Sequence, residues 1–177
     1  VGKTEFKDVY AQPVVASGRL YASSISGGLF SLALDTGEEL WSADLAGIVR
    51  MKGFEEDVVA VNHRGIMFRL DTHTHKLRWK VNFGTEVGNV MDPVVLGEDL
   101  AVTLSKGSLF LIEGVTGEPI LQFDAGLGFN GRVARSDAGL LFVLSNGGVV
   151  YGFREGGVPD SFKIEIPLVT PPGRGVF

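Results

Sequence analysis

Four short segments of the chain follow one pattern: a glycine precedes an aromatic residue by three positions, and hydrophobic residues stand directly before the aromatic residue and two positions after it. The aromatic residues are Phe30, Phe68, Phe110 and Tyr151. They lie 38, 42 and 41 residues apart. An internal repeat of about 40 residues built from short apolar runs is typical of β-propeller blades. The repeat therefore predicts an all-β fold in which each unit forms one sheet.

Each repeat holds short apolar runs separated by turn residues, which predicts four antiparallel strands in up-and-down order. We expect blades at about 11–45, 46–84, 85–125 and 126–166, and a tail at 167–177 whose Pro and Gly residues end regular structure. Residues 1–177 are thus predicted to form a single, partial propeller domain. It would contain four four-stranded antiparallel blades, half of an eight-bladed β-propeller.

Composition excludes several classes of function. The formal net charge of -5 gives no support for nucleic-acid binding, which draws on clustered Lys and Arg. The absence of Cys removes disulfides and thiol-based sites, and no apolar run is long enough to span a membrane. Because the chain begins at Val1, we read it as a trimmed or mature piece whose export signal would lie upstream.

A turn signature follows the aromatic residue in three of the repeats. It reads Thr36-Gly37, Thr74-His75 and Thr116-Gly117, and the first two are followed by Trp41 and Trp79. Gly at such a turn supplies a positive φ at low cost, and the Thr hydroxyl can bond the neighbouring backbone. The repeat, G-x-L-F-x-L followed by T-G-x-x-x-W, resembles the quinoprotein-like (PQQ-like) β-propeller repeat. The resemblance covers Pro13 to Ile166, and it departs from the pattern at His75, where Gly is usual, and at Leu121, which replaces Trp.

The resemblance implies how the blades join, because Trp on the outer strand packs over the Thr-Gly turn of an adjoining blade in this family. We therefore expect a structural, blade-docking role for seven residues. They are Thr36, Gly37, Trp41, Thr74, Trp79, Thr116 and Gly117.

Within the superfamily, the degenerate repeats are most similar to those of the BamB-type scaffold proteins of outer-membrane protein assembly. This likeness implies a non-enzymatic, protein-binding scaffold in the periplasm or cell envelope of a bacterium, without a cofactor, whose partners include outer-membrane assembly components. Similar blades also serve enzymes and receptors, so two alternatives stay open. These are a fragment of a quinoprotein dehydrogenase and a ligand-binding sensory ectodomain.

Four blades would leave an apolar face uncovered at each end of the set. Burying such faces stabilises a protein by about 25 cal/mol per Å² of apolar area, so we expect them to be covered. Three arrangements can cover them: a homodimer that closes an eight-bladed ring, further blades of a longer chain of which this is a fragment, or closure of the four blades on themselves.

A cluster of cations in the second repeat is a candidate interaction surface. Arg64, Arg69, Lys76 and Arg78 lie close together in an acidic chain and could attract an acidic partner. The alternative is a solvated blade edge without a partner.

The sequence contains no recognisable group of catalytic or metal-binding residues. His63, His73 and His75 lie in the second repeat, but a third metal ligand is not identifiable. Quinone-dependent catalysis would need calcium-binding carboxylate and amide groups. Asp8, Glu86, Asp92 and Asn130 lie near blade starts, but their spacing is no better than chance. We predict no catalytic, cofactor-binding or metal-binding residues.

Overall fold

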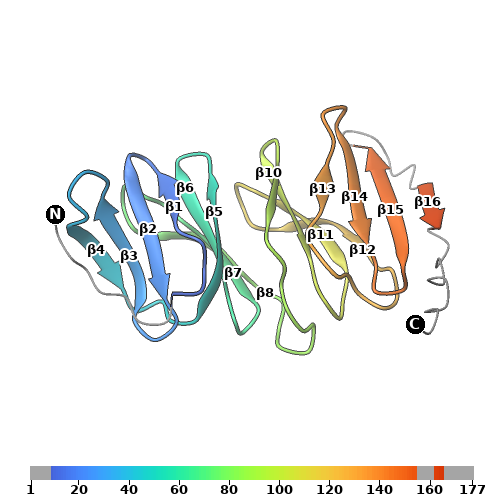
Figure 1. Ribbon diagram of the computed structural model, residues 1–177, viewed down its shortest axis with the longest axis horizontal. Helices are drawn as coiled ribbons and strands as arrows, with labels where there is room; N and C mark the ends of the chain where they lie inside the picture. The colour runs from blue at the N-terminus through green and yellow to red at the C-terminus, as the bar shows by residue number, and fades with distance from the viewer. Residues whose placement is uncertain (1–8, 155–161, 166–177) are drawn as a thin grey trace, which may run out of the picture.

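The computed structural model describes residues 9–154 and 162–165, in which every regular element is a strand (Figure 1). The sixteen strands, in chain order, are β1 (Val14–Ala16), β2 (Arg19–Ser24), β3 (Gly28–Ala33), β4 (Glu39–Ala43), β5 (Ile48–Phe54), β6 (Asp57–Asn62), β7 (Ile66–Leu70), β8 (Leu77–Asn82), β9 (Val94–Leu96), β10 (Asp99–Thr103), β11 (Leu109–Glu113), β12 (Pro119–Phe123), β13 (Ala134–Arg135), β14 (Leu140–Leu144), β15 (Val149–Arg154) and β16 (Phe162–Glu165).

The strands form four separate sheets of four, each antiparallel and each in simple up-and-down order. The sheets are β1–β4, β5–β8, β9–β12 and β13–β16, and we call them blades 1 to 4. The all-β fold of four propeller blades is therefore confirmed. In Figure 1, β1 and β13 lie toward the middle, whereas β4 and β16 stand at the two ends. The tail expected at 167–177 lies outside the described residues.

The hairpin between the third and fourth strands is built alike in blades 1 to 3. The amides of Gly37, His75 and Gly117 donate to the carbonyl four residues earlier, at 2.9, 2.9 and 2.8 Å. All three residues have a positive φ, of 70°, 56° and 77°. The pairing register shifts at the same place in each hairpin, as a β-bulge would shift it. This shared geometry gives each outer strand the same direction relative to its own sheet.

Apolar side chains fill the space between successive blades, so the molecule has three cores rather than one. Strand β6 shows the arrangement: Val58 and Ala60 belong to the core shared with blade 1, and Val59 and Val61 to the core shared with blade 3. Successive side chains of a strand point to opposite faces of its sheet. A strand buried on both faces is therefore apolar throughout, which explains the continuous run from Val58 to Val61.

The two ends of the blade set carry the same kind of apolar face as the junctions inside it. We call the face of a blade toward the preceding blade its leading face and the opposite face its trailing face. On the leading face of blade 2, Val58 pairs with Leu70 and Ala60 with Phe68. The equivalent pairs on blade 1 are Leu20 with Leu32 and Ala22 with Phe30. The trailing face of blade 4 carries Phe142, Leu144 and Val150.

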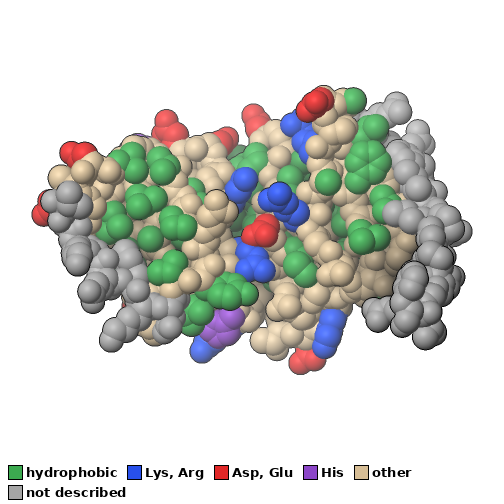
Figure 2. Space-filling view, viewed as in Figure 1, with side chains coloured by type: hydrophobic (Ala, Val, Ile, Leu, Met, Phe, Trp, Pro, Cys, Tyr) green, Lys and Arg blue, Asp and Glu red, His purple; other side chains and the backbone are tan. Residues whose placement is uncertain are grey.

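Figure 2 shows hydrophobic side chains gathered over both ends of the molecule, with charged side chains between them. Exposed apolar residues occur on both end faces: Val15 of blade 1 is 59% exposed and Leu144 of blade 4 is 43% exposed. The pattern of the interior junctions thus continues to the outermost blades. Among the described residues, no helix has the length and hydropathy required to cross a membrane.

Candidate protein-binding surfaces

Blade 2 docks on blade 3 through Trp79. The indole Nε1–H donates to the carbonyl of Gly114 at 2.7 Å, and the side chain is almost fully buried. The ring lies against Gly117, where a Cβ atom would come within 2.6 Å of the indole Cδ2. Glycine is therefore required at position 117 for two reasons: the backbone has a positive φ, and the indole occupies the space that a side chain would need.

Blade 1 docks on blade 2 through an equivalent contact with different chemistry. Trp41 stacks on the ring of His75, with a centroid distance of 4.4 Å and an interplanar angle of 8°. His75 takes the left-handed backbone conformation that Gly117 takes in blade 3. Its ring also lies 3.2 Å from Arg19 Nη1. Burial, and secondly the charge of Arg19, hold the pKa of His75 below its usual value.

Arg69 was expected to belong to an exposed basic cluster, and the structure shows that this expectation is wrong. Arg69 is only 6% exposed. Its guanidinium pairs with Asp57 at 2.6 Å and with Glu55 at 2.6 Å, and it donates to the carbonyl of Gly114 at 2.8 Å. It also lies over the ring of Phe54 at 4.6 Å. Arg69 therefore joins blade 2 to the turn of blade 3 and cannot contact a partner.

Arg78 forms ion pairs inside the molecule and is also partly exposed to solvent. It donates to the same Asp57 oxygen as Arg69, at 2.6 Å, and pairs with Asp71 at 2.8 Å, while 47% of its side chain is exposed. The hydrogen bond to Asp57 is the main reason that the pKa of Arg78 is raised. Asp71 in turn accepts from the amides of Thr74 and His73, which lowers its pKa. Of the predicted cluster, Arg64, Lys76 and Arg78 are exposed.

The three histidines do not converge on one site. His63 Nδ1 contacts the carbonyl of Gly47 at 3.3 Å, His73 lies 3.9 Å from Glu56, and His75 lies under Trp41. In the part of the chain that the structure describes, no three His, Asp or Glu side chains gather as metal ligands would.

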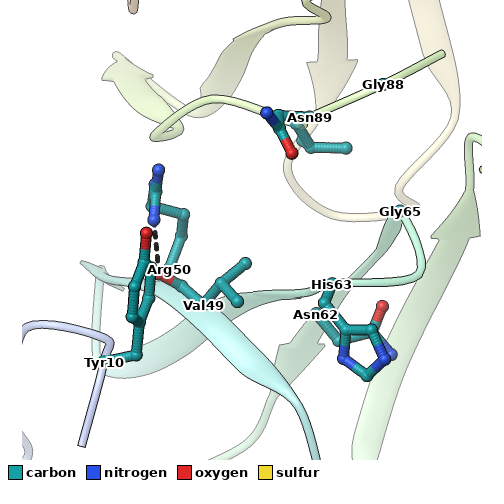
Figure 3. Close-up of a pocket in the computed structure, with 9 residues that line it drawn as sticks. Tyr10, Val49, Arg50, Asn62, His63, Gly65, Gly88 and Asn89 are labelled. Atoms are coloured by element: carbon teal, nitrogen blue, oxygen red, sulfur yellow. Dashed lines mark hydrogen bonds between the residues drawn. The ribbon is translucent and has the colours of Figure 1, made fainter. Parts of the chain in front are cut away.

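A polar cavity of about 150 Å³ lies where blades 2 and 3 meet the segment before blade 1 (Figure 3). Tyr10, Arg50, Asn62, His63 and Asn89 line it, together with Val49, Gly65, Gly88 and Val90. The Arg50 guanidinium lies 5.7 Å from the Tyr10 ring, and its Nε is 3.1 Å from Asp92 Oδ1. Asp92 is thus the acidic residue beside Arg50 at this cavity.

A second cavity, of about 200 Å³ and mainly apolar, opens between blades 1 and 2. We call it the Phe68 pocket, and its lining residues are Leu45, Ala46, Asn62, Ile66, Phe68, Leu77 and Lys80. The sequence did not predict it, because Leu45 and Ala46 precede Phe68 by more than 20 residues and meet it only when the blades pack.

Repeated four-stranded sheets that dock on one another through tryptophan and a tight turn define the class of protein: a β-propeller repeat protein of the PQQ-like type. The chain belongs to the family described as "Outer membrane protein assembly factor BamB", whose sequence profile matches residues 2–81 and 27–158.

Curated relatives agree with this assignment at low identity. The outer membrane protein assembly factor BamB of Alkalilimnicola ehrlichii is 25% identical over 147 residues, which are 83% of this chain and 38% of that protein. The protein of the same name in Legionella pneumophila is 21% identical over 145 residues, 81% of this chain and 37% of that protein. The chain thus spans well under half the length of these relatives.

Solved structures share the fold. BamB from Moraxella catarrhalis superposes with a TM-score of 0.70 at 20% identity, covering 82% of this chain and 46% of that chain. The quinohemoprotein alcohol dehydrogenase ADHIIG from Pseudomonas putida HK5 superposes with a TM-score of 0.69 at 13% identity, covering 92% of this chain and 35% of that chain. At these identities the likeness describes the fold alone.

Proposed function

We propose that the chain acts as a non-enzymatic, protein-binding scaffold in outer-membrane protein assembly, in the periplasm or cell envelope of a bacterium. The observation that carries the proposal is the family match over residues 2–81 and 27–158. The curated relatives that bear the name of an assembly factor support the same role. A rigid set of blades suits such a role, because docked sheets hold their loops and edges in fixed positions.

The surfaces left for partners follow from the contacts between blades. Arg69, Trp41 and Trp79 are used inside the molecule, so partner contacts fall on the exposed side chains at the blade edges and turns, with Arg64, Lys76 and Arg78 as the cationic candidates. We propose that they attract an acidic protein surface, which would speed association more than it strengthens the complex.

The end faces call for a partner of a different kind from the acidic protein surface. We propose that each is covered by another blade of the same repeat, supplied by a second copy that closes an eight-bladed ring or by further repeats of a longer chain. The supporting observation is that blade 1 repeats, on its leading face, the apolar pairs that blade 2 buries against blade 1.

The experiment that tests the scaffold role is deletion of the encoding gene in the source bacterium, followed by measurement of outer-membrane protein levels by mass spectrometry. The levels of several outer-membrane proteins are expected to fall, and to recover when the gene is restored. Unchanged levels would contradict the proposed role.

A second candidate, part of a quinoprotein dehydrogenase, draws on the similarity to the Pseudomonas putida enzyme. Incubating the purified chain with pyrroloquinoline quinone, calcium, an alcohol and a redox dye separates the two candidates. We expect no dye reduction above a control without protein, whereas sustained turnover would favour the dehydrogenase.

A further inference from the structure

The Phe68 pocket lies at a junction that has leucine where the next junction has phenylalanine. Leu45 follows Trp41 by four residues, and Phe83 follows Trp79 by four. Phe83 covers Phe110 of blade 3, with ring centroids 5.4 Å apart. At the junction of blades 1 and 2, the smaller Leu45 packs beside Phe68 instead. Leu45 and Phe68 both line the cavity of about 200 Å³.

The cavity is large enough for a single aromatic or branched aliphatic side chain. An apolar cavity of about 150 Å³ holds benzene, so about 200 Å³ accommodates a phenyl ring. Its walls are mainly aliphatic and aromatic, with Leu77 46% exposed at its edge. An exposed leucine beside a hollow offers apolar area that a partner can bury.

On the blade 2 side, the charged residues around the pocket are cations. Lys80 lines the pocket, Lys76 directly precedes Leu77 of its lining, and Arg64 lies two positions before Ile66 of its lining. Within the described ranges, no ion pair joins Lys80, Arg64 or Lys76 to an acid of this chain. Asp44, exposed next to Leu45, is the acidic residue on the blade 1 side. These cations are therefore available to acidic groups of a partner.

We propose that the Phe68 pocket binds an extended acidic peptide segment through one aromatic side chain, which enters the cavity while neighbouring carboxylates pair with Lys80 and the cations beside it. This inference rests on the proposed protein-binding function and specifies the chemistry of one partner segment. The aromatic group supplies most of the binding free energy through burial, and the carboxylates supply orientation and rate.

The test is fluorescence anisotropy with the purified chain and a labelled peptide that carries one phenylalanine between two pairs of aspartates. Replacing the phenylalanine by alanine is expected to weaken binding about 10- to 100-fold. Leu45→Phe places the residue type found at the next junction in the wall of the pocket and narrows it, so it is expected to weaken binding without lowering the melting temperature. Lys80→Glu is expected to weaken binding about three- to tenfold and to reduce its dependence on salt.

The matched control is Lys52→Glu, which changes an exposed lysine of β5 that does not line the pocket and should leave peptide affinity unchanged. The inference is overturned if the wild-type chain does not bind the peptide, or if Leu45→Phe binds it as tightly as wild type. It is also overturned if Lys52→Glu weakens binding as much as Lys80→Glu. Peptide binding and the deletion phenotype are independent readouts, so failure of the pocket and failure of the assembly role are distinguishable.

Discussion

Single residues at the outer turns determine whether two blades can approach. Gly117 meets the indole of Trp79, and His75 meets the indole of Trp41, although both residues hold the same positive φ. Glycine permits contact at the backbone itself, whereas histidine replaces that contact by ring stacking. The same turn therefore supports two docking chemistries.

Substitution of Gly117 tests the first chemistry. Gly117→Ala is expected to lower the free energy of unfolding by about 1 kcal/mol for the left-handed conformation and by a further ~1–3 kcal/mol for the clash with Trp79. Gly84→Ala is the matched control, because Gly84 has a φ of 81° and no atom within 4 Å of the added Cβ. Urea denaturation of both variants measures the difference, and equal losses would contradict the assigned contact.

The pH dependence of stability tests the second chemistry. Since the folded protein holds the pKa of His75 below its unfolded value, the unfolded chain binds more protons when the pH falls below about 6.5. Acidification from pH 7.5 to 5.5 should therefore destabilise the wild type more than His75→Asn, which keeps a residue tolerant of positive φ. His73→Asn, at a side chain that is 63% exposed, should keep the wild-type pH dependence of the melting temperature. An unchanged pH dependence in His75→Asn would contradict the assignment.

At the scale of strands and turns, the sequence indicated the repeat, the sheets and the residue types at the junctions, because all of these recur with a period near 40. It did not indicate the role of Arg69. That side chain pairs with Asp57 and Glu55 and reaches Gly114, 45 positions away, and none of these contacts recurs in the described parts of the other repeats. A contact made once between distant segments leaves no periodic signal, so exposed and buried cations look alike in the sequence. The Phe68 pocket was missed for the same reason.

The buried contacts of Arg69 with Asp57, Glu55 and Gly114, which we call the buried network, lead to a prediction about stability. Arg69→Met leaves Asp57, which is 1% exposed, with Arg78 as its remaining cationic partner and is expected to cost on the order of 3 kcal/mol of stability. Arg64→Met, at an exposed position, should change stability by less than about 0.5 kcal/mol. Chemical denaturation of both variants compares them, and a stable Arg69→Met protein would show that the network is not needed.

At the scale of the whole molecule, the two end faces are the surfaces through which we expect the chain to associate. Leu20, Ala22, Phe30 and Leu32 occupy on blade 1 the positions that pack against a preceding blade elsewhere. Ala22 and Leu32 are each only 5% exposed, so the open apolar area of this face lies at residues such as Val15, which is 59% exposed. Exposed apolar area favours association with a matching face. The trailing face of blade 4, with Leu144 and Val150, is the matching partner that the chain itself contains.

For the 177-residue chain in isolation we therefore expect a homodimer with twice the mass of 18.9 kDa by light scattering. Val15→Lys places a charge on the leading face of blade 1 and should shift the protein toward the monomer. Ile120→Lys, at a residue of β12 that is 53% exposed, is the control and should leave the mass unchanged. A monomeric wild type at micromolar concentration would contradict ring closure by a second copy.

The shared leading-face positions also bear on how such a gene can change over evolutionary time. Loss or duplication of one complete unit of about 40 residues would bring together surfaces that already fit, since every junction pairs the same two kinds of face. An insertion of one residue inside a strand would instead reverse which side chains meet the neighbouring blade. Descendants of this gene should accordingly differ in length by whole units, with smaller changes confined to the loops.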